Sequence, residues 1–275
     1  MTIDEKYDLL RQIIKKLGRI VVAYSGGVDS TFLLKTCVDV LGSKNVLACI
    51  AAGPSLPKSQ YAKAVEMAKN MQVAVETVEP NELADKTYSA NKADRCFHCK
   101  SHLFKILNKL AKEKGFDCVI CGSNTDDFND YRPGNKAVKI FNVRCPLAEA
   151  HLAKKDIRQL SRKLNLPTAS LPASPCLASR ISYGEEITEQ KLKQVEQAEE
   201  FLKSLGFVEF RVRLHGRLAR IEVHQDEIAK VVALRQKIIE QLKSLGFKFV
   251  SVDLEGFRSG SLNEMLSQED KRKNL

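Results

Sequence analysis

The residues best suited to chemistry lie at positions 25–30, with the sequence Ser-Gly-Gly-Val-Asp-Ser. An apolar segment (19–24) precedes them and a segment of helical composition (31–38) follows. This order predicts a strand, a glycine turn and a helix N-terminus, where backbone N–H groups and the helix dipole attract an anion. Gly26 and Gly27 let the backbone approach a phosphate that a Cβ atom would obstruct. The sequence therefore predicts a phosphate-binding loop.

Hydroxyl groups and a missing lysine define the type of this loop. Ser25, Ser30 and Thr31 add hydroxyl donors, and Asp29 lies among them. The pattern lacks the lysine of the sequence G-x-x-x-x-G-K-[ST], so it is not a Walker loop. An ordinary tight turn from strand to helix is the alternative.

Two cysteines three residues apart form a second candidate site. Cys96 and Cys99 follow a polar loop (91–95) at the start of a predicted helix that continues over 99–114. Such a pair can hold one metal ion or cluster. The helix N-terminus, Arg95 and Lys100 would lower the pKa of both thiols. Cys176, next to a proline, is the plausible third ligand; the set suits a four-iron cluster with one open iron site, or a redox pair with a separate nucleophile. A chance pair is the alternative.

The other cysteines are predicted to belong to the core. Cys118 and Cys121 lie in one predicted strand, where residues three apart point to opposite faces and cannot share a metal. The apolar contexts of Cys37, Cys49 and Cys145 also indicate core positions. Eight cysteines in a chain without a secretion signal favour thiols, a metal or a cluster over disulfides.

Acidic residues gather just beyond the predicted strand 117–121, which ends at Gly122. The cluster comprises Asp126, Asp127 and Asp130 with Tyr131, Arg132 and Gly134. A carboxylate there, for which Asp126 is our candidate, is placed to meet a nucleotide-bound Mg²⁺ near Asp29. A solvated acidic turn is an equal alternative.

Paired arginines mark the last part of the chain. Arg211 and Arg213 share one face of a predicted strand (208–214), and Arg220 and Glu222 share a face of the next strand (218–224). Two guanidinium groups on one face suit a phosphate or carboxylate ligand. Cross-strand ion pairs are the alternative, which the residues alone favour.

Strand and helix patterns alternate through the first part of the chain. Strands are predicted at 19–24, 46–51, 73–78 and 117–121, a further short strand or hairpin arm at 139–143, and helices at 58–71, 99–114 and 156–164. This alternation predicts an α/β fold with a doubly wound parallel sheet that binds ligands at the carboxyl ends of its strands.

A different pattern follows a segment rich in Pro, Ser and Ala (168–179). Helices are predicted at 189–205 and 227–245, and strands at 208–214, 218–224 and 248–254, with a hairpin turn at 215–216. We therefore expect a nucleotide-binding domain at 1–175 and a smaller C-terminal α+β domain at 176–275 for substrate binding or oligomerisation.

Composition restricts the class of protein and its partners. The 44 basic and 34 acidic residues leave a net charge of +10, which favours polyanions such as nucleic acid, nucleotides or acidic metabolites. A solvated lysine-rich surface explains the same charge. No apolar run is long enough to span a membrane, and the polar N-terminus is unlike a signal peptide. We expect a cytoplasmic enzyme.

Five stretches of the chain resemble the LarE family of ATP-dependent sulfur transferases, which belongs to the ATP pyrophosphatases and acts in synthesis of the nickel-pincer nucleotide cofactor. The stretches are 24–30, 95–100, 122–127 with 130–134, 175–180 with 183–184, and 211–216 with 219–222. All ATP pyrophosphatases share the first, whereas the Pro-Cys-Leu-Ala-Ser-Arg stretch and the arginines of the last are more specific.

The resemblance implies a reaction and a role for each site residue. A carboxylate of pyridinium-3,5-biscarboxylic acid mononucleotide would be adenylated by ATP, with release of pyrophosphate, and then converted to a thiocarboxylate. The resemblance assigns ATP to Ser25, Gly26, Gly27, Asp29, Ser30 and Gly122, and the substrate to Arg211, Arg213 and Lys100. It assigns catalytic roles to Asp29, Cys176 and Arg180, with Arg180 orienting the adenylate.

The resemblance also leaves two sources for the sulfur. In some members the cysteine at the position of Cys176 gives up its own sulfur, while others hold a [4Fe-4S] cluster whose open iron carries an extra sulfide. Cys96, Cys99 and Cys176 match the second type, so we expect a reusable enzyme with ATP, Mg²⁺ and a [4Fe-4S] cluster. The family implies a homo-oligomer, with a hexamer as one form, and the sulfide donor is unknown.

Other enzyme classes compete with this interpretation. A tRNA thiolation enzyme of the same superfamily also combines such a loop with three cysteines, but the chain shows no paired zinc ribbons and no appended RNA-binding module. Nucleic acid is therefore not the expected partner. An amide-forming NAD or GMP synthetase would use ammonia and need no cysteine trio. A nucleotide-sensing or iron–sulfur storage module would bind ATP without releasing pyrophosphate.

Overall fold

The computed structural model describes residues 1–128, 132–172, 175–258 and 260–273. The chain divides into two compact units, each of which is described by itself. The first unit comprises Met1–Glu82 and Cys96–Ser174, and the second comprises Leu83–Arg95 and Pro175–Asn274. The segment 83–95, which the sequence analysis placed in the first domain, thus counts with the second unit.

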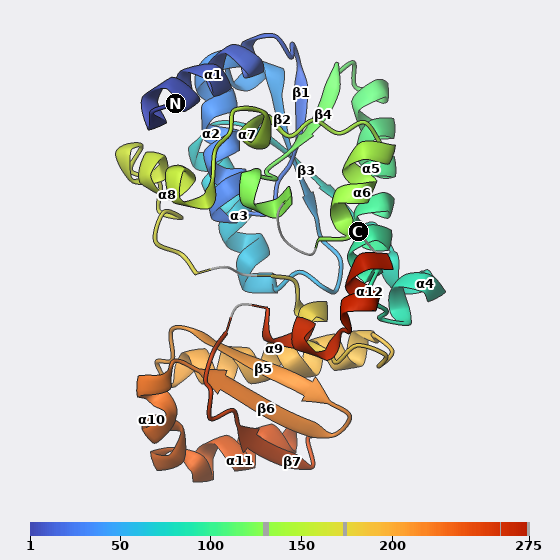
Figure 1. Ribbon diagram of the computed structural model, residues 1–275, viewed down its shortest axis with the longest axis vertical. Helices are drawn as coiled ribbons and strands as arrows, with labels where there is room; N and C mark the ends of the chain where they lie inside the picture. Colours follow the sequence, from blue (N-terminus) through green and yellow to red (C-terminus); the bar gives the residue numbers. More distant parts are fainter. Residues whose placement is uncertain (129–131, 173–174, 259, 274–275) are drawn as a thin grey trace. The chain divides into compact units, whose positions relative to one another are not determined.

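The first unit is built on a four-stranded parallel sheet with the strand order β3-β2-β1-β4 (Figure 1). Its strands are β1 (Ile20–Ala23), β2 (Val46–Ala51), β3 (Ala74–Val78) and β4 (Cys118–Cys121). The strand order changes direction at β1, because β2 lies on one side of it and β4 on the other. Ligands of such sheets bind at the carboxyl end of this position. The predicted α/β fold with a parallel sheet is confirmed.

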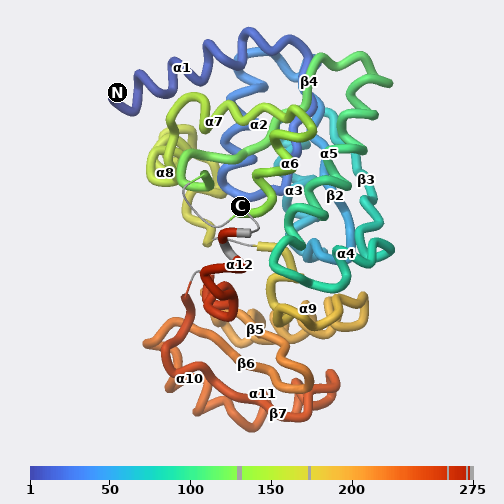
Figure 2. Tube along the Cα trace, turned by 45° about the vertical axis from the view of Figure 1, so that its right-hand side comes forward, coloured from blue at the N-terminus to red at the C-terminus, as the bar shows by residue number. Residues whose placement is uncertain are grey.

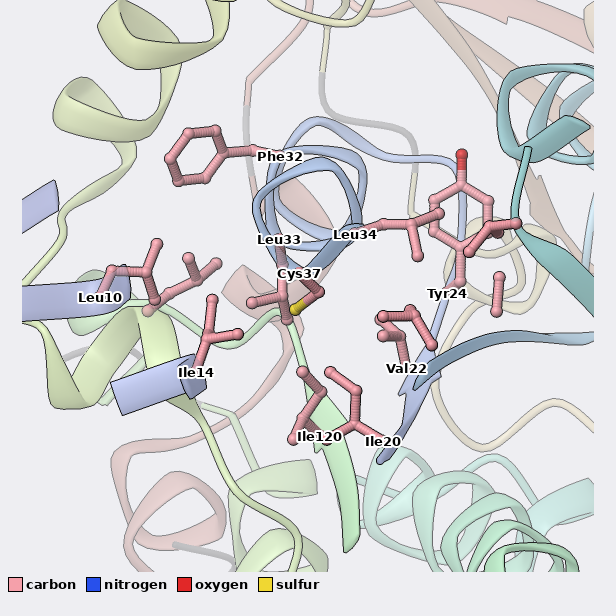
Figure 3. Close-up of a cluster of buried hydrophobic side chains, with 14 of the residues drawn as sticks. Leu10, Ile14, Ile20, Val22, Tyr24, Phe32, Leu33, Leu34, Cys37 and Ile120 are labelled. Carbon is pink, nitrogen blue, oxygen red and sulfur yellow. The ribbon is translucent and has the colours of Figure 1, made fainter. Parts of the chain in front are cut away.

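Helices cover both faces of this sheet (Figures 1 and 2). One face packs against α1 (Ile3–Lys15), α2 (Val28–Leu41), α3 (Lys58–Asn70) and α8 (Lys154–Lys163). The other packs against α5 (Arg95–Glu113) and α6 (Gly134–Ile140), and the short α7 (Pro146–Glu149) follows α6 along the chain. Figure 3 shows the first core, in which Ile20, Val22 and Ile120 of the sheet meet Leu33 of α2.

The alternation of side chains along each strand explains the two cores. Val21 and Cys121 belong to the core with α5 and α6, whereas Ile20 and Ile120 belong to the core with α1 and α2. Cys118 packs against the core with α1 and α2, whereas Cys121 belongs to the core with α5 and α6. The two cysteines therefore lie on opposite faces of the sheet, as predicted.

One predicted strand of the first unit is wrong. Residues 139–143 were expected to form a short strand, but Lys139 and Ile140 end helix α6. Ala137, Val138 and Phe141 recur at helical spacing and pack into the core beside α5, which favours the helix over an extended strand. Beyond the helix, Arg144 makes a single parallel bridge to Ile120.

The second unit contains a three-stranded mixed sheet with the order β5-β6-β7. β5 (Phe210–His215) and β6 (Leu218–Val223) form the predicted antiparallel hairpin, and β7 (Phe249–Val252) pairs parallel to β6. Helix α9 (Glu189–Ser204) packs against β5. The single helix expected at 227–245 is two helices, α10 (Ile228–Ala233) and α11 (Arg235–Ser244). The short α4 (Lys86–Ser89) and α12 (Gln268–Lys273) complete the unit.

Buried hydrogen bonds explain why 83–95 belongs to the second unit. Asn91 is fully buried, and its Nδ2 donates to the carbonyl oxygens of Ile181 and Ser182 at 3.2 and 2.8 Å. Arg95 donates to Asn91 Oδ1 and, at 3.0 Å, to the carbonyl oxygen of Ala178.

None of the helices that the structure describes is long and apolar enough to cross a membrane.

Candidate functional site

Residues 25–30, called the glycine loop below, connect β1 to α2 as the sequence predicted. Gly27 is the N-cap of α2, and the first intrahelical hydrogen bond runs from Thr31 N to Gly27 O at 2.9 Å. The amides of Val28, Asp29 and Ser30 therefore precede the hydrogen-bonded turns of the helix. They lie at the carboxyl end of β1, where the sheet changes direction. This is an arrangement that can receive the charge of a phosphate.

Two glycines allow the tight packing of the glycine loop. Gly26 has a φ angle of +72°, and a Cβ atom there would lie 2.7 Å from the Cβ of Ala64 in α3. Gly122, which follows β4, packs against the start of α2, because a Cβ atom there would lie 3.0 Å from Ser30 N. The ends of β1 and β4 thus meet, and the six residues assigned to ATP lie together in the first unit.

Hydroxyl groups hold the glycine loop in shape. Ser25 Oγ lies 3.1 Å from Ser30 Oγ, and Ser30 Oγ also donates to Gly27 O at 3.2 Å. Ser25 is exposed and is placed to contact a ligand. The prediction for Thr31 is wrong: its side chain is fully buried and lies 3.4 Å from the hydroxyl of Tyr24, so it is part of the core.

Asp29 is held by a lysine that sequence reasoning missed. Lys154 Nζ, at the start of α8, donates to Asp29 Oδ2 at 2.5 Å, and the backbone N–H of Lys154 donates to Asp126 Oδ2 at 2.9 Å. Burial raises the pKa of Asp29, and the charge of Lys154 opposes that shift. Lys154 begins α8 two residues after the buried Leu152, and this local position does not reveal which carboxylate its side chain reaches.

Asp29 offers one carboxylate oxygen that suits a hard cation. Asp29 Oδ1 is buried and has no hydrogen-bond partner among the described residues, so one oxygen remains for a ligand. Asp127 is buried and close enough to raise the pKa of Asp29, and its Oδ1 pairs with Arg132 at 2.9 Å. Asp126 is exposed and caps α8. The predictions for Asp130 and Tyr131 lie outside the described residues.

The three predicted cluster ligands are divided between the units. Cys96 and Cys99 occupy the first turn of α5, where a spacing of three residues places both side chains on one side of the helix. Cys96 is exposed and Cys99 is half-buried. Cys176 belongs to the second unit and is also half-buried. Within the described parts of the chain, no three potential ligands form a metal group.

Residues 175–180, called the cysteine turn below, are fastened by Arg180. The Arg180 side chain is 2% exposed and makes a bidentate ion pair with Glu199 of α9, with both nitrogen–oxygen distances 2.9 Å. Its Nη1 donates to the carbonyl oxygens of Pro175 and Cys176 at 2.6 and 3.1 Å. All three guanidinium nitrogens thus act inside the second unit, and they fix the backbone on both sides of the Cys176 side chain.

The two paired arginines of β5 differ in their partners. Arg213 donates twice to the fully buried Glu222, at 3.0 and 2.9 Å, which is the cross-strand ion pair that the residues alone favoured. Arg211 lies over the ring of Phe257, 4.9 Å from its centroid. Burial, with the positive charges of Arg180 and Arg213, lowers the pKa of Arg211 to about 10. An anion bound at Arg211 would offset this cost.

Lys100, the remaining predicted substrate residue, lies on α5 in the first unit. Its side chain crosses Gly134, where a Cβ atom would lie 2.7 Å from Lys100 Cδ. Its charge also acts on the thiols of Cys121 and Cys145, which form a buried pair. Sequence reasoning placed both cysteines in the core but gave no sign that they meet.

Comparisons with known proteins agree with this geometry. The model of the NAD synthase family matches residues 2–113, which include the glycine loop. The chain is 37% identical to pyridinium-3,5-bisthiocarboxylic acid mononucleotide synthase of Lactiplantibacillus plantarum, over 97% of each chain. It is 43% identical to an uncharacterised protein of Synechocystis, over 97% of this chain and all of the relative. An NH₃-dependent NAD⁺ synthetase of Fusobacterium nucleatum is 25% identical over 62% of this chain and 67% of its own length.

The similarity to the synthase covers both units and all five stretches that the sequence analysis singled out, whereas the NAD synthase model covers only part of the first unit. Together with the glycine loop at the switch point of a parallel sheet, this full-length match shows that the chain belongs to the LarE family of ATP-dependent sulfurtransferases.

Proposed function

We propose that this enzyme adenylates a carboxylate of pyridinium-3,5-biscarboxylic acid mononucleotide and converts it to a thiocarboxylate in nickel-pincer nucleotide synthesis. The observation that carries the proposal is the full-length similarity to the bisthiocarboxylic acid mononucleotide synthase. The geometry of the glycine loop supports the activation step, and the cysteine turn supports the sulfur step.

Activation places charge where the glycine loop can receive it. A carboxylate oxygen of the substrate attacks the α-phosphorus of ATP, the bond to the bridging oxygen breaks, and pyrophosphate leaves with the electron pair. The amides of Val28, Asp29 and Ser30 are placed to stabilise that charge. Mg²⁺, when bound, would neutralise phosphate oxygens, and Asp29 Oδ1, which no described residue engages, is its expected ligand. Lys154 would keep Asp29 ionised.

The sulfur step requires a nucleophile at the acyl carbon of the adenylate. Sulfur adds to this carbon and AMP leaves, so that a thiocarboxylate remains. A [4Fe-4S] cluster, when bound, supplies a sulfide at its open iron. Cys96 and Cys99 fit two of its ligand positions because they share one helical turn, and Cys176 is the proposed third. Arg180 acts here as a positioning residue for Cys176.

We assign the substrate phosphate to Arg211 rather than to Arg213. Both arginines have partners: Arg213 donates to Glu222 and Ser261, and Arg211 donates to Phe210 O. The assignment therefore rests on charge, because burial and the neighbouring arginines disfavour the positive charge of Arg211 and an anion would offset this. Replacing Arg211 by Met should raise the KM for the mononucleotide while leaving the KM for ATP unchanged. Unchanged mononucleotide KM would remove Arg211 from the site. Lys100 remains a proposed substrate ligand in the first unit.

The decisive experiment measures iron in the anaerobic protein after reconstitution with iron and sulfide. Wild type and the variants C96A, C99A and C176A are compared by absorbance, electron paramagnetic resonance and iron content. C118A is the matched control, because Cys118 packs against the core with α1 and α2, on the sheet face opposite α5. We expect a four-iron signal that only the first three variants lose. Iron-free protein that forms thiocarboxylate while Cys176 becomes dehydroalanine would instead identify Cys176 as the sulfur source.

The competing functions predict different products. The similarity to an NAD⁺ synthetase makes an amide-forming synthetase one alternative. Supplied with ammonia, the C176A variant of such an enzyme should still form product. A tRNA thiolation enzyme would bind bulk tRNA, with an affinity that falls steeply as salt rises. A homo-oligomer and a cytoplasmic location stay predictions; sedimentation velocity tests the first.

A further inference from the structure

Cys121 and Cys145 are brought together by a short parallel pairing in the first unit. Cys121 is the last residue of β4, and Cys145 precedes α7. The residues before them, Ile120 and Arg144, form a parallel bridge, in which Arg144 N donates to Val119 O and Cys121 N donates to Arg144 O. Both cysteines therefore follow paired positions, and their side chains lie on the same face.

The two sulfur atoms are in contact inside the core. Their Sγ atoms are 3.5 Å apart, and the two residues are only 7% and 6% exposed. Neighbouring strands lie about 4.8 Å apart. That spacing falls within the Cα separation of about 4.4–6.8 Å that disulfides use, so a bond needs the sulfurs to approach to about 2.05 Å with little backbone movement. Apolar residues of α5 and α6 surround the pair.

We propose that Cys121 and Cys145 form a redox modification site that peroxide-class oxidants close to a disulfide, separate from Cys96, Cys99 and Cys176. The surroundings distinguish the two sulfurs. The hydrogen bond from Cys145, with the charge of Lys100, lowers the pKa of Cys121 to about 6 despite its burial, and Ser123 assists. The pKa of Cys145 is raised, because the shared proton stays on it. The hydrogen bond thus makes Cys121 the more acidic thiol of the pair.

This division of roles suits a two-step oxidation by hydrogen peroxide. The Cys121 thiolate attacks one peroxide oxygen, the O–O bond breaks, and Cys121 becomes a sulfenic acid as hydroxide leaves. The Cys145 sulfur then attacks the Cys121 sulfur, and the departing hydroxyl takes up the thiol proton as water. Two electrons pass from the cysteines to peroxide, and the hydroxide takes a proton from solvent. A dithiol such as dithiothreitol reverses the reaction.

The site lies beside the glycine loop. One peptide bond joins Cys121 to Gly122, which packs so closely against Ser30 that a Cβ atom there would lie 3.0 Å from Ser30 N. Cys145 follows Arg144, whose bridge to Ile120 brings the chain back to the end of β4. Because Gly122 already packs tightly against Ser30, even the small movement that closes the bond would press the end of β4 against the start of α2, so oxidation should weaken ATP binding. This coupling rests on the proposed ATP site, whereas formation of the disulfide does not.

Peptide mapping tests the disulfide directly. The full-length protein, purified without oxygen, is treated with hydrogen peroxide, alkylated under denaturing conditions and digested. We expect a peptide linking Cys121 to Cys145, which dithiothreitol removes. C118A is the control and should form the same link. C145S should give no link but a Cys121 sulfenic acid that dimedone traps. Cys121 and Cys145 recovered as separate alkylated or over-oxidised peptides from the wild type would overturn the proposal.

ATP binding tests the coupling in a variant whose proposed cluster ligands are absent. In C96S/C99S/C176S, calorimetry before and after peroxide should show ATP binding weaker by about tenfold, because small displacements in a positioned site have large effects. Recovery with dithiothreitol is expected. A complete disulfide with unchanged ATP affinity would refute the coupling. Reduced protein that binds no ATP would refute the proposed function, while the peptide map would still decide the disulfide.

Discussion

We predict that the ion pair of Arg180 with Glu199 is the main ionic contribution to the stability of the second unit, and replacing Arg180 by Met tests this. The substitution keeps much of the side-chain volume but removes the Arg180 donors to Glu199 and to the carbonyl oxygens of Pro175 and Cys176. Removing one partner of a buried ion pair costs about 3–5 kcal/mol, because the other charge stays buried without compensation. The Glu199 side chain is 14% exposed, so water relieves part of this cost. We therefore expect a loss of about 3 kcal/mol.

A double-mutant cycle separates the ion pair from the other bonds of Arg180. E199Q alone should also destabilise the unit, since it weakens a bidentate pair and the hydrogen bond from Val212 N to Glu199 Oε1. The double variant should recover part of the combined loss. Residues in direct contact show coupling energies of about 0.5–3 kcal/mol, and this geometry favours about 2 kcal/mol.

Hydrogen exchange followed by mass spectrometry is the appropriate assay, because it reads each unit of the intact chain separately. The opening free energy of β5 amides should fall in R180M, while that of β1 amides should not change. R217M is the matched control: Arg217 is an exposed arginine of the same unit and should change stability by no more than about 0.5 kcal/mol. A loss below about 1 kcal/mol in R180M would refute this contribution and leave the guanidinium for a ligand.

Three further perturbations test the glycine loop and the buried charges. G26A should lower the melting temperature and abolish ATP binding, because its Cβ would clash with α3 at a φ of +72°; G27A, at −76°, should melt like the wild type, and equal melting of both would contradict the packing. K154M should weaken Mg·ATP binding about tenfold or more in calorimetry, since a hydrogen bond to a charged group contributes about 1.5–3 kcal/mol. K155M, which changes an exposed neighbour, should bind like the wild type, and parallel losses would count against a specific role. Burial raises the pKa of Glu222, but the hydrogen bonds that it accepts prevail and hold its pKa below 4.5. This carboxylate therefore stabilises the fold above pH 4.5, and the contribution disappears as the pH falls through the lowered pKa. In urea unfolding, E222Q should reduce the loss of stability at acid pH. An unchanged pH dependence would show that this carboxylate does not contribute to it.

Local patterns were sufficient for most of the strands and for the glycine loop. A buried parallel strand is a continuous apolar run, and the segment 46–51 needs no partner to be recognised. The hairpin of β5 and β6 follows from alternation around Gly216, and the opposite faces of Cys118 and Cys121 follow from the two-residue period. The segment 139–143 failed because a short apolar run fits a strand or a helix until its packing partners are known.

The sequence by itself determined which residues are candidates for the chemistry: the glycine loop, the cysteines and the arginines, because residue type and local spacing define donors, thiols and charges. Only the tertiary structure decided which of them meet. Lys154 reaches Asp29 across 125 positions of the chain, Cys121 reaches Cys145 across 24, and Arg180 reaches Glu199 from a different element. Such pairings depend on how strands and helices pack in space, and no local period of the sequence records that arrangement.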